Sequence, residues 1–537
     1  MISFVRRHLI WFCWGILCLA RLPSLFDPIW YGDEAIYLAV AQGIARGQLL
    51  YVQVWDNKPP LLYLVYTFSN LIFGGVLWPL RVIGVILAGL TIRYSQLFAS
   101  RVLQFNSRYV DLVTVLVTIL FSFGLETTIF NAENLFAPLL VIGTYYVFTG
   151  PKLFRLFIGS LVWGMAILTK IPTVAEILGL WLVFVLTSIA EIPSSEERVL
   201  ENFIKKTQIY FGHFGNMLRN LIILAGVVLP LGLTSIFYWV RGHWGEFYFA
   251  VVGFAGDYIG DSKLPPVVFG IPLKTPGGFG GVLPDIGFSQ LQWKVVFFGI
   301  LVVALAILFV RQKISRSTFL VSVWVALAAF GSLISGRNYP HYLIQVFVPF
   351  ALFTAVIIGK YRSLNTVSTN NSSFQFRTAL IISYLLIINQ FTITFASGLM
   401  IPPYFSPTKY WWDFGRVITN QMTLANWQRD YNPDSYDTQK ELIPIIQSLT
   451  GQDDRILIIG NWAELYVGSK RLSSYYIPVE YNWTDQSSQV WDKAKDQTKL
   501  AIIDTKSGKA KEIRPSIAGD MKYQRTVLNR YEIWLKK

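Results

Sequence analysis

Residues 221–240 read LIILAGVVLPLGLTSIFYWV, a run of twenty residues without a charged side chain. A helix needs about 20 apolar residues to cross the hydrocarbon core of a bilayer. Comparable apolar runs, some of them shorter, recur near residues 8–25, 61–77, 80–98, 110–125, 134–149, 156–170, 173–190, 295–311, 317–335, 343–359 and 378–397. The pattern predicts an all-α polytopic membrane protein.

The composition supports this class. Of the 537 residues, 53% are hydrophobic and only 15% are charged, whereas an ordinary globular protein carries roughly a quarter charged residues. A water-soluble protein is therefore excluded. A disulfide scaffold is excluded as well, because Cys13 and Cys18 are the two cysteines of the whole chain.

Basic residues, which outnumber acidic ones by 46 to 32, concentrate between the apolar runs. The clusters are Arg6 and Arg7, residues 93–108, Lys152 and Arg155, and residues 198–219, 311–316 and 360–377. Such clusters are typical of cytoplasmic loops. No basic stretch is interleaved with aromatic residues in the way that strand-binding grooves are, so we expect no nucleic-acid partner.

The same charges decide the number of crossings. If all twelve runs crossed, the basic segment 93–108 would lie outside, against the charge rule. Residues 61–77 are short, contain Asn70 and follow the Lys58-Pro59-Pro60 break. When this run is interpreted as a juxtamembrane helix, about 11 transmembrane helices remain and every basic cluster lies inside.

Two domains are predicted. Residues 1–398 form a transmembrane module with a first outer loop at 26–79 and a long outer loop at 241–294, which contains the non-helical stretch IPLKTPGGFGGVLPDIG. Residues 399–537 form a small soluble α/β domain outside the cytoplasm, with strands at RILIIG, KLAIIDT and YEIWL. The N-terminus reads as an uncleaved signal anchor and lies in the cytoplasm.

Charged residues gather in the outer layer of this topology. They are Asp33, Glu34, Asp56, Lys58, Arg81, Glu133 and Lys170. Several have an ordinary explanation, since Asp33 and Glu34 suit the start of a short helix, Lys170 can snorkel to the interface and Glu133 can cap the following helix. A charge at membrane depth costs roughly 2.5–3.5 kcal/mol and persists when it is paired or lines a wet cavity. An outward cleft with carboxylates and cations would suit deprotonation of a nucleophile and binding of a phosphate.

Six features occur in a characteristic order: GDEAIY at 32–37, WDNKPPLLY at 55–63, Arg81, Glu133, the pair Thr169-Lys170, and GRNYPHYLIQ at 336–345. In order and spacing, residues 1–400 resemble the polyprenyl-phosphate-sugar-dependent glycosyltransferases of the GT-C fold. The likeness is to bacterial relatives of the dolichyl-phosphate-mannose protein mannosyltransferases and of the lipid A aminoarabinose transferases. The phrase ILIIGNWAELYVGSKRLSSYYI at 456–477 resembles their C-terminal domains.

The resemblance implies a hexosyl- or pentosyltransferase that moves a sugar from a polyprenyl-phosphate donor to an extracytoplasmic protein, lipid or glycan by inverting single displacement. It implies Asp33 as the general base, with Glu34 and Glu133 shaping the catalytic site. The implied contacts to the lipid phosphate are Lys58, Arg81, Lys170, Arg337 and Tyr342. Aminoarabinose-type transferases often carry an acid before the Lys-Pro pair, where this chain has Asn57. We therefore carry over neither a metal site nor aminosugar specificity; a divalent metal stays open, and no other cofactor is predicted.

Two other functions fit the sequence less well. A carrier or flippase of lipid-linked or small polar substrates would place charges in mid-helix and pair discontinuous helices, whereas the charges here gather on one side. A membrane-anchored sensor acting through its tail would leave the Asp33 loop without a role. The prediction is a transferase in a bacterial plasma (inner) membrane, in contact with membrane lipids.

Overall fold

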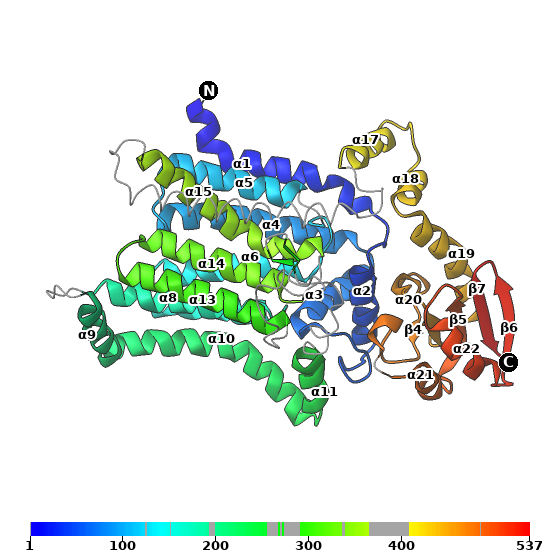
Figure 1. Cartoon of the computed structure of the whole chain (residues 1–537). Coiled ribbons are helices and arrows are strands. Elements are labelled where there is room, and N and C mark those ends of the chain that lie inside the picture. The colour runs from blue at the N-terminus through cyan, green and yellow to red at the C-terminus, as the bar shows by residue number, and fades with distance from the viewer. Residues whose placement is uncertain are drawn as a thin grey trace.

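The computed structural model describes residues 2–123, 126–150, 152–192, 199–254, 267–268, 271–272, 290–335, 339–364, 407–483 and 485–537. A bundle of long helices lies beside a smaller domain that contains a β-sheet (Figure 1). The long helices of the bundle are α1 (Ile2–Arg21), α4 (Trp78–Leu97), α5 (Ser107–Phe123), α6 (Ala132–Phe148), α7 (Leu153–Ile167), α8 (Thr173–Ala190), α10 (Phe214–Val240), α13 (Gln290–Val310), α14 (Arg316–Leu333) and α15 (Phe347–Leu364). The shorter segments are η1 (Leu22–Phe26), α2 (Gly32–Ala45), α3 (Pro60–Phe73), η2 (Phe98–Val102), α9 (Val199–Gly212), α11 (Trp244–Tyr248), η3 (Phe249–Gly253) and η4 (Pro340–Val346).

The bundle has the character of a membrane protein. Within the described residues, six helices are long and apolar enough to span a bilayer, and four shorter ones are apolar. The outer side of α10 exposes Leu221, Leu233 and Ile236, which is stable only against lipid. The span expected at 378–397 and most of the Gly/Pro-rich stretch lie outside the described residues, so the count of eleven stays a prediction.

The run at residues 61–77, expected as a juxtamembrane helix, forms the shorter helix α3 (Pro60–Phe73). It begins at Pro60, whose fixed φ suits a first helical position. It ends before Gly74, which has a φ of 76° in the left-handed region where glycine is unstrained. Its 14 residues extend about 21 Å, less than the roughly 30 Å of a hydrocarbon core.

Close helix packing in the bundle depends on small residues. A side-chain carbon at Gly143 of α6 would lie 2.7 Å from the Gly159 carbonyl oxygen of α7, and one at Gly159 would lie 2.8 Å from the Gly143 oxygen. The two backbones are therefore in direct contact. Small residues allow this approach, which provides the van der Waals packing that holds helices together in lipid.

The C-terminal domain is an α/β unit. Its helices are α17 (Pro407–Ile418), α18 (Leu424–Tyr431), α19 (Pro433–Leu449), α20 (Ala463–Ser469), η5 (Glu480–Asn482), α21 (Ser487–Ala494) and α22 (Ala510–Ala518). Its strands are β3 (Arg455–Ile459), β4 (Leu472–Ser473), β5 (Thr498–Asp504), β6 (Tyr523–Leu528) and β7 (Tyr531–Lys536), in the order β4-β3-β5-β7-β6. Strand β3 pairs in parallel with β4 and β5, and β7 pairs antiparallel with β5 and β6.

The three predicted tail strands are confirmed as β3, β5 and β7. Their buried apolar runs made them recognisable, since Ile458 pairs with Ile502 and Ile502 pairs with Ile533 in the centre of the sheet. Strand β6 was not predicted, because it lies at the edge and four of its residues are exposed. In the long outer loop, the short hairpin of β1 (Val267–Val268) and β2 (Ile271–Pro272) is described.

Candidate active site

The first outer loop lies where the bundle meets the tail domain. Helices α2 and α3 occupy that end of the bundle, and α2 lies next to α20 and β4 of the tail (Figure 1). Asp33 and Glu34 stand in the first turn of α2, where the helix dipole favours negative charge. Asp33 is half-buried and Glu34 is fully buried, so within this pair only Asp33 can meet a substrate.

A cavity of about 90 Å³ contains three of the five predicted phosphate contacts. Its lining residues are Asn57, Lys58, Pro59, Lys170, Ile171, Pro172, Val251, Phe254, Gly331, Ile334, Ser335 and Tyr342. The ammonium of Lys170 lies 3.7 Å from the centre of the Tyr342 ring. The lining thus combines cationic and polar residues with apolar ones.

Two backbone segments far apart in sequence deliver the lysines. The amide of Leu61, at the start of α3, donates to the carbonyl oxygen of Leu168 at 2.9 Å. This bond joins the Pro59-Pro60 break to the turn between α7 and α8, so Lys58 and Lys170 reach one cavity. The Lys58 ammonium also donates to Oδ1 of Asn57 at 2.6 Å.

Glu133 holds Lys170 in place. The two form an ion pair in which the Lys170 side chain is 12% exposed and that of Glu133 is 2% exposed. Burial lowers the pKa of Lys170, whereas Glu133 and, more weakly, Asp33 oppose this change. Lys170 is therefore a partly desolvated cation paired with the buried carboxylate of Glu133, rather than a side chain that extends into water.

Arg81 and Glu34 form a buried ion pair beside the site. Their side chains pair at 2.6 Å and are both 0% exposed. Glu34 also accepts from the Phe130 amide at 2.6 Å, and Arg81 also donates to the Thr128 carbonyl oxygen. Arg81 is not among the residues that line the cavity, and Glu34 is fully buried in this pair, so the phosphate contact of Arg81 and the site-shaping role of Glu34 stay predictions. Arg337 lies outside the described residues.

Sequence reasoning missed Glu126 and His341 as site residues. Both are buried next to Tyr31, the residue that precedes α2, and His341 directly precedes Tyr342. His341 lies in the segment GRNYPHYLIQ, which the sequence analysis had singled out. The sequence does not show, however, that its partner is Glu126, 215 residues away. Within the described part of the chain, no group of three His, Cys, Asp or Glu side chains is arranged to hold a metal ion.

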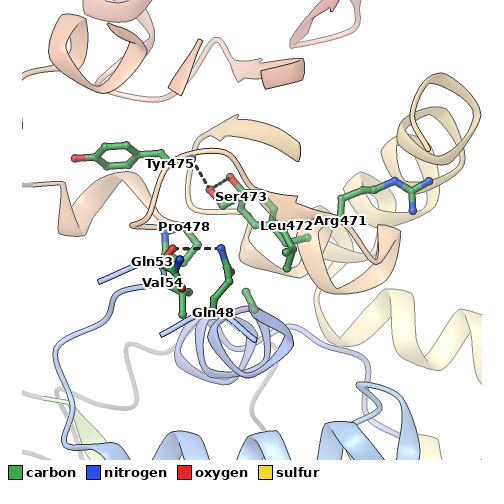
Figure 2. Close-up of a pocket in the computed structure, with 10 residues that line it drawn as sticks. Gln48, Gln53, Val54, Arg471, Leu472, Ser473, Tyr475 and Pro478 are labelled. Atoms are coloured by element: carbon green, nitrogen blue, oxygen red, sulfur yellow. Dashed lines mark hydrogen bonds between the residues drawn. The ribbon is translucent and has the colours of Figure 1, made fainter. Parts of the chain in front are cut away.

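The tail domain contacts the loop that carries Lys58. The Trp55 amide donates to the Tyr476 carbonyl oxygen at 2.8 Å, and Nδ2 of Asn482 donates to Oδ1 of Asp56 at 3.1 Å. Figure 2 shows a small pocket at this contact, lined by Gln48, Gln53 and Val54 of the loop and by Arg471, Leu472, Ser473, Tyr475 and Pro478 of the tail. The tail therefore supports the candidate site.

A buried acid lies beside a second contact between the tail domain and the first outer loop, at Ile29. Burial raises the pKa of Glu464, at the start of α20, to about 7; its Oε1 accepts from Ser435 at 2.8 Å, and Gln439 binds the Ile29 carbonyl oxygen beside it. The folded state holds the proton more tightly than the unfolded state, so stability falls as pH rises from about 4.5 to about 7 and then stays level. This loss is on the order of 3 kcal/mol.

We therefore expect Glu464→Gln to stabilise the purified protein at pH 8 much more than at pH 5. Thermal unfolding in detergent at both values measures the difference, with Asp453→Asn, an exposed acid, as the control. An equal shift at the two pH values would contradict a protonated Glu464.

The comparisons with known proteins bear on the fold. No protein-family profile matches the chain, and no curated protein matches it in sequence. Among solved structures, ArnT from Cupriavidus metallidurans bound to undecaprenyl phosphate is similar with a TM-score of 0.52 and 13% identity, over 99% of this chain and 97% of ArnT. The apo state of the same ArnT has a TM-score of 0.53, 13% identity and 98% coverage of both chains.

These similarities define the class of protein. The chain is an integral membrane protein with the GT-C fold, and its C-terminal α/β domain belongs to the matched architecture because the alignment covers nearly all of both chains. Within that class it has the overall architecture of ArnT at 13% identity. The fold expected from the ordered motifs is confirmed.

Proposed function

We propose that this protein is a membrane glycosyltransferase that moves a sugar from a polyprenyl-phosphate donor to a hydroxyl of an extracytoplasmic protein, lipid or glycan. The observation that carries the proposal is the cavity in which Lys58, Lys170 and Tyr342 meet. Two cations suit a phosphate, and the apolar part of the lining suits the first isoprene units attached to it. Undecaprenyl phosphate, bound in the similar ArnT structure, is such a lipid.

The transfer would be a single displacement. The acceptor oxygen attacks the anomeric carbon and its proton passes to the carboxylate of Asp33, while the bond from that carbon to the phosphate oxygen breaks. Lys58 and Lys170 stabilise the charge that develops on the leaving phosphate. Glu133 orients Lys170, and attack opposite the leaving group inverts the sugar configuration.

We infer that the cavity opens on the extracytoplasmic side. Helix α14 runs from Arg316, in a basic turn, to Gly331 near its other end at the cavity. Helix α7 begins directly after Lys152, contains Arg155 in its first turn, and ends at the turn that carries Lys170. Helix ends with clustered basic residues lie on the cytoplasmic side. Helix α9, in the basic segment 198–219, lies at the end of the bundle far from the tail domain (Figure 1). The N-terminus is then cytoplasmic and the tail extracytoplasmic, in a bacterial inner membrane.

The overall proposal is tested by mass spectrometry of glycolipids and glycoproteins from cells with and without the gene. We expect one saccharide to be missing from one class of acceptor in its absence. Donor binding by the purified protein without any transfer, together with unchanged glycans, would favour the carrier instead.

The lysines are tested through the lipid phosphate. We expect Lys58→Met and Lys170→Met each to weaken binding of undecaprenyl phosphate in detergent by about 10- to 100-fold, because a hydrogen bond to a charged group contributes roughly 1.5–3 kcal/mol. Methionine keeps most of the apolar stem and removes the charge. The double variant should lose less than the sum, since both act on one group.

Lys511→Met, an exposed tail residue, is the matched control and should bind as the native protein does. Native affinity in Lys170→Met would remove this residue from the phosphate site and leave Lys58 and Tyr342 as the cavity groups to examine.

A further inference from the structure

Three segments that carry proposed site residues meet at one carboxylate. Tyr31 precedes α2 and stands two residues before Asp33. Glu126 lies in the turn between α5 and α6, ahead of Glu133. His341 lies in η4, directly before Tyr342.

The contacts around Glu126 are short and specific. Its Oε2 accepts from the Tyr31 hydroxyl at 3.1 Å and from the His341 amide at 3.1 Å, and it lies 2.6 Å from Nδ1 of His341. The Tyr31 hydroxyl is also 3.0 Å from the same Nδ1. Glu126 is 8% exposed and His341 is 4% exposed. One buried oxygen therefore joins all three segments.

The backbone of Glu126 is held in an unfavourable conformation. Its φ is 55°, in the left-handed region that residues other than glycine seldom adopt. Such a conformation costs on the order of 1–3 kcal/mol and persists where the surroundings determine it. Glycine would adopt this conformation without strain, but it has no side chain. Glutamate at this position places a carboxylate in the interior.

Aromatic contacts connect the Glu126 cluster to the cavity. The His341 ring lies edge to face with Tyr31 at 6.1 Å and with Tyr342 at 4.6 Å, measured between ring centres. Tyr342 in turn receives the Lys170 ammonium on its face. A continuous chain of contacts thus runs from the segment before Asp33 to the cation that faces the proposed phosphate.

We propose that Tyr31, Glu126 and His341 are positioning residues that set the distance between the general base Asp33 and the phosphate-binding pair Lys170 and Tyr342. The inference rests on the proposed function and adds the device that aligns its two halves. In a displacement the base and the leaving group lie on opposite sides of the reacting carbon, so their separation must match the substrate. A misplacement of about 1 Å can cost about 10²-fold in rate.

The test separates alignment from folding and from donor binding. We expect His341→Phe and Tyr31→Phe to lower kcat by about 10- to 100-fold, with undecaprenyl phosphate affinity within about twofold of native. Thermal unfolding should change little in Tyr31→Phe, which keeps the contact between His341 and Glu126, and should occur at a lower temperature in His341→Phe, which leaves the buried Glu126 without that partner. His341→Asn places an amide nitrogen where Nδ1 stands, so it should recover much of the rate lost in His341→Phe. Tyr248→Phe, an exposed tyrosine on α11, is the silent control.

Each result decides the inference. Native kcat in both Tyr31→Phe and His341→Phe would overturn it, even if Asp33→Asn is inactive and the proposed function stands. Equal loss in His341→Asn and His341→Phe, with lowered thermal stability in both, would assign the cluster to folding alone. If Asp33→Asn itself transfers sugar at the native rate, Asp33 is not the base, and this result contradicts the proposed function rather than the role of Tyr31, Glu126 and His341.

Discussion

Asp33→Asn should abolish most sugar transfer, lowering kcat by roughly 10² to 10⁴, the usual loss when a general base is removed. The amide keeps the size of the side chain but cannot accept the acceptor proton. Asp33 is the half-buried member of the acidic pair, and its charge weakly opposes the lowering of the Lys170 pKa that burial causes. Transfer by purified protein, measured with donor lipid extracted from the native cells, gives the rate.

The control for this experiment must remove an acid without touching the cavity. Asp453→Asn in the turn before β3 does so, because Asp453 is exposed in the tail domain. It should leave the rate unchanged. Membrane expression and undecaprenyl phosphate binding of Asp33→Asn should also be native. A native rate in this variant would exclude Asp33 as the base.

Arg81→Met should lower stability by about 3–5 kcal/mol, the typical cost of leaving one member of a buried ion pair alone. Glu34 would then be a buried carboxylate without its cation, held only by the Phe130 amide. The pair joins α2 to α4 and to the turn before α6, so its loss should also disturb Asp33. Thermal unfolding in detergent measures the effect.

A double variant separates the pair from the rest of the site. Glu34→Gln together with Arg81→Met removes both charges and should recover part of the stability that Arg81→Met loses, because no unpaired charge remains. Lys58→Met, at the cavity, should leave unfolding nearly unchanged. An Arg81→Met protein as stable as the native one, but defective in binding undecaprenyl phosphate, would support the prediction that Arg81 holds the phosphate.

Much of the architecture could be predicted from local pattern. Apolar runs define helices because each helix satisfies its own backbone in lipid, and the break at Lys58-Pro59-Pro60 defined the start of α3 because proline fits a first helical turn. Strands β3, β5 and β7 were recognisable because buried β-runs are continuous and apolar. Strand β6 was missed because its exposed edge residues lack that pattern.

The site could be predicted only in part, and Arg81 and His341 show why. Ordered motifs placed Asp33, Lys58, Lys170 and Tyr342 in one layer, and the structure brings the last three to one cavity. In the sequence, Arg81 was as good a candidate for binding phosphate as the two lysines. In the structure its guanidinium pairs with Glu34, 47 residues away. His341 looked like an apolar-segment residue, yet it meets Glu126 across 215 residues.

The sequence by itself determined the membrane class, the two-domain division and the types of residue in the outer layer. Hydropathy and charge are local properties of a segment, and they decide whether that segment lies in lipid or in water. Which cation faces the cavity and which is buried in a pair was decided only by the tertiary structure. The energy of a charge depends on its partner and on its distance from water, and both are set by segments far apart in sequence. Glu34 and Asp33 are neighbours in the chain, yet the packing around them buries Glu34 in an ion pair and leaves Asp33, the proposed base, half-buried.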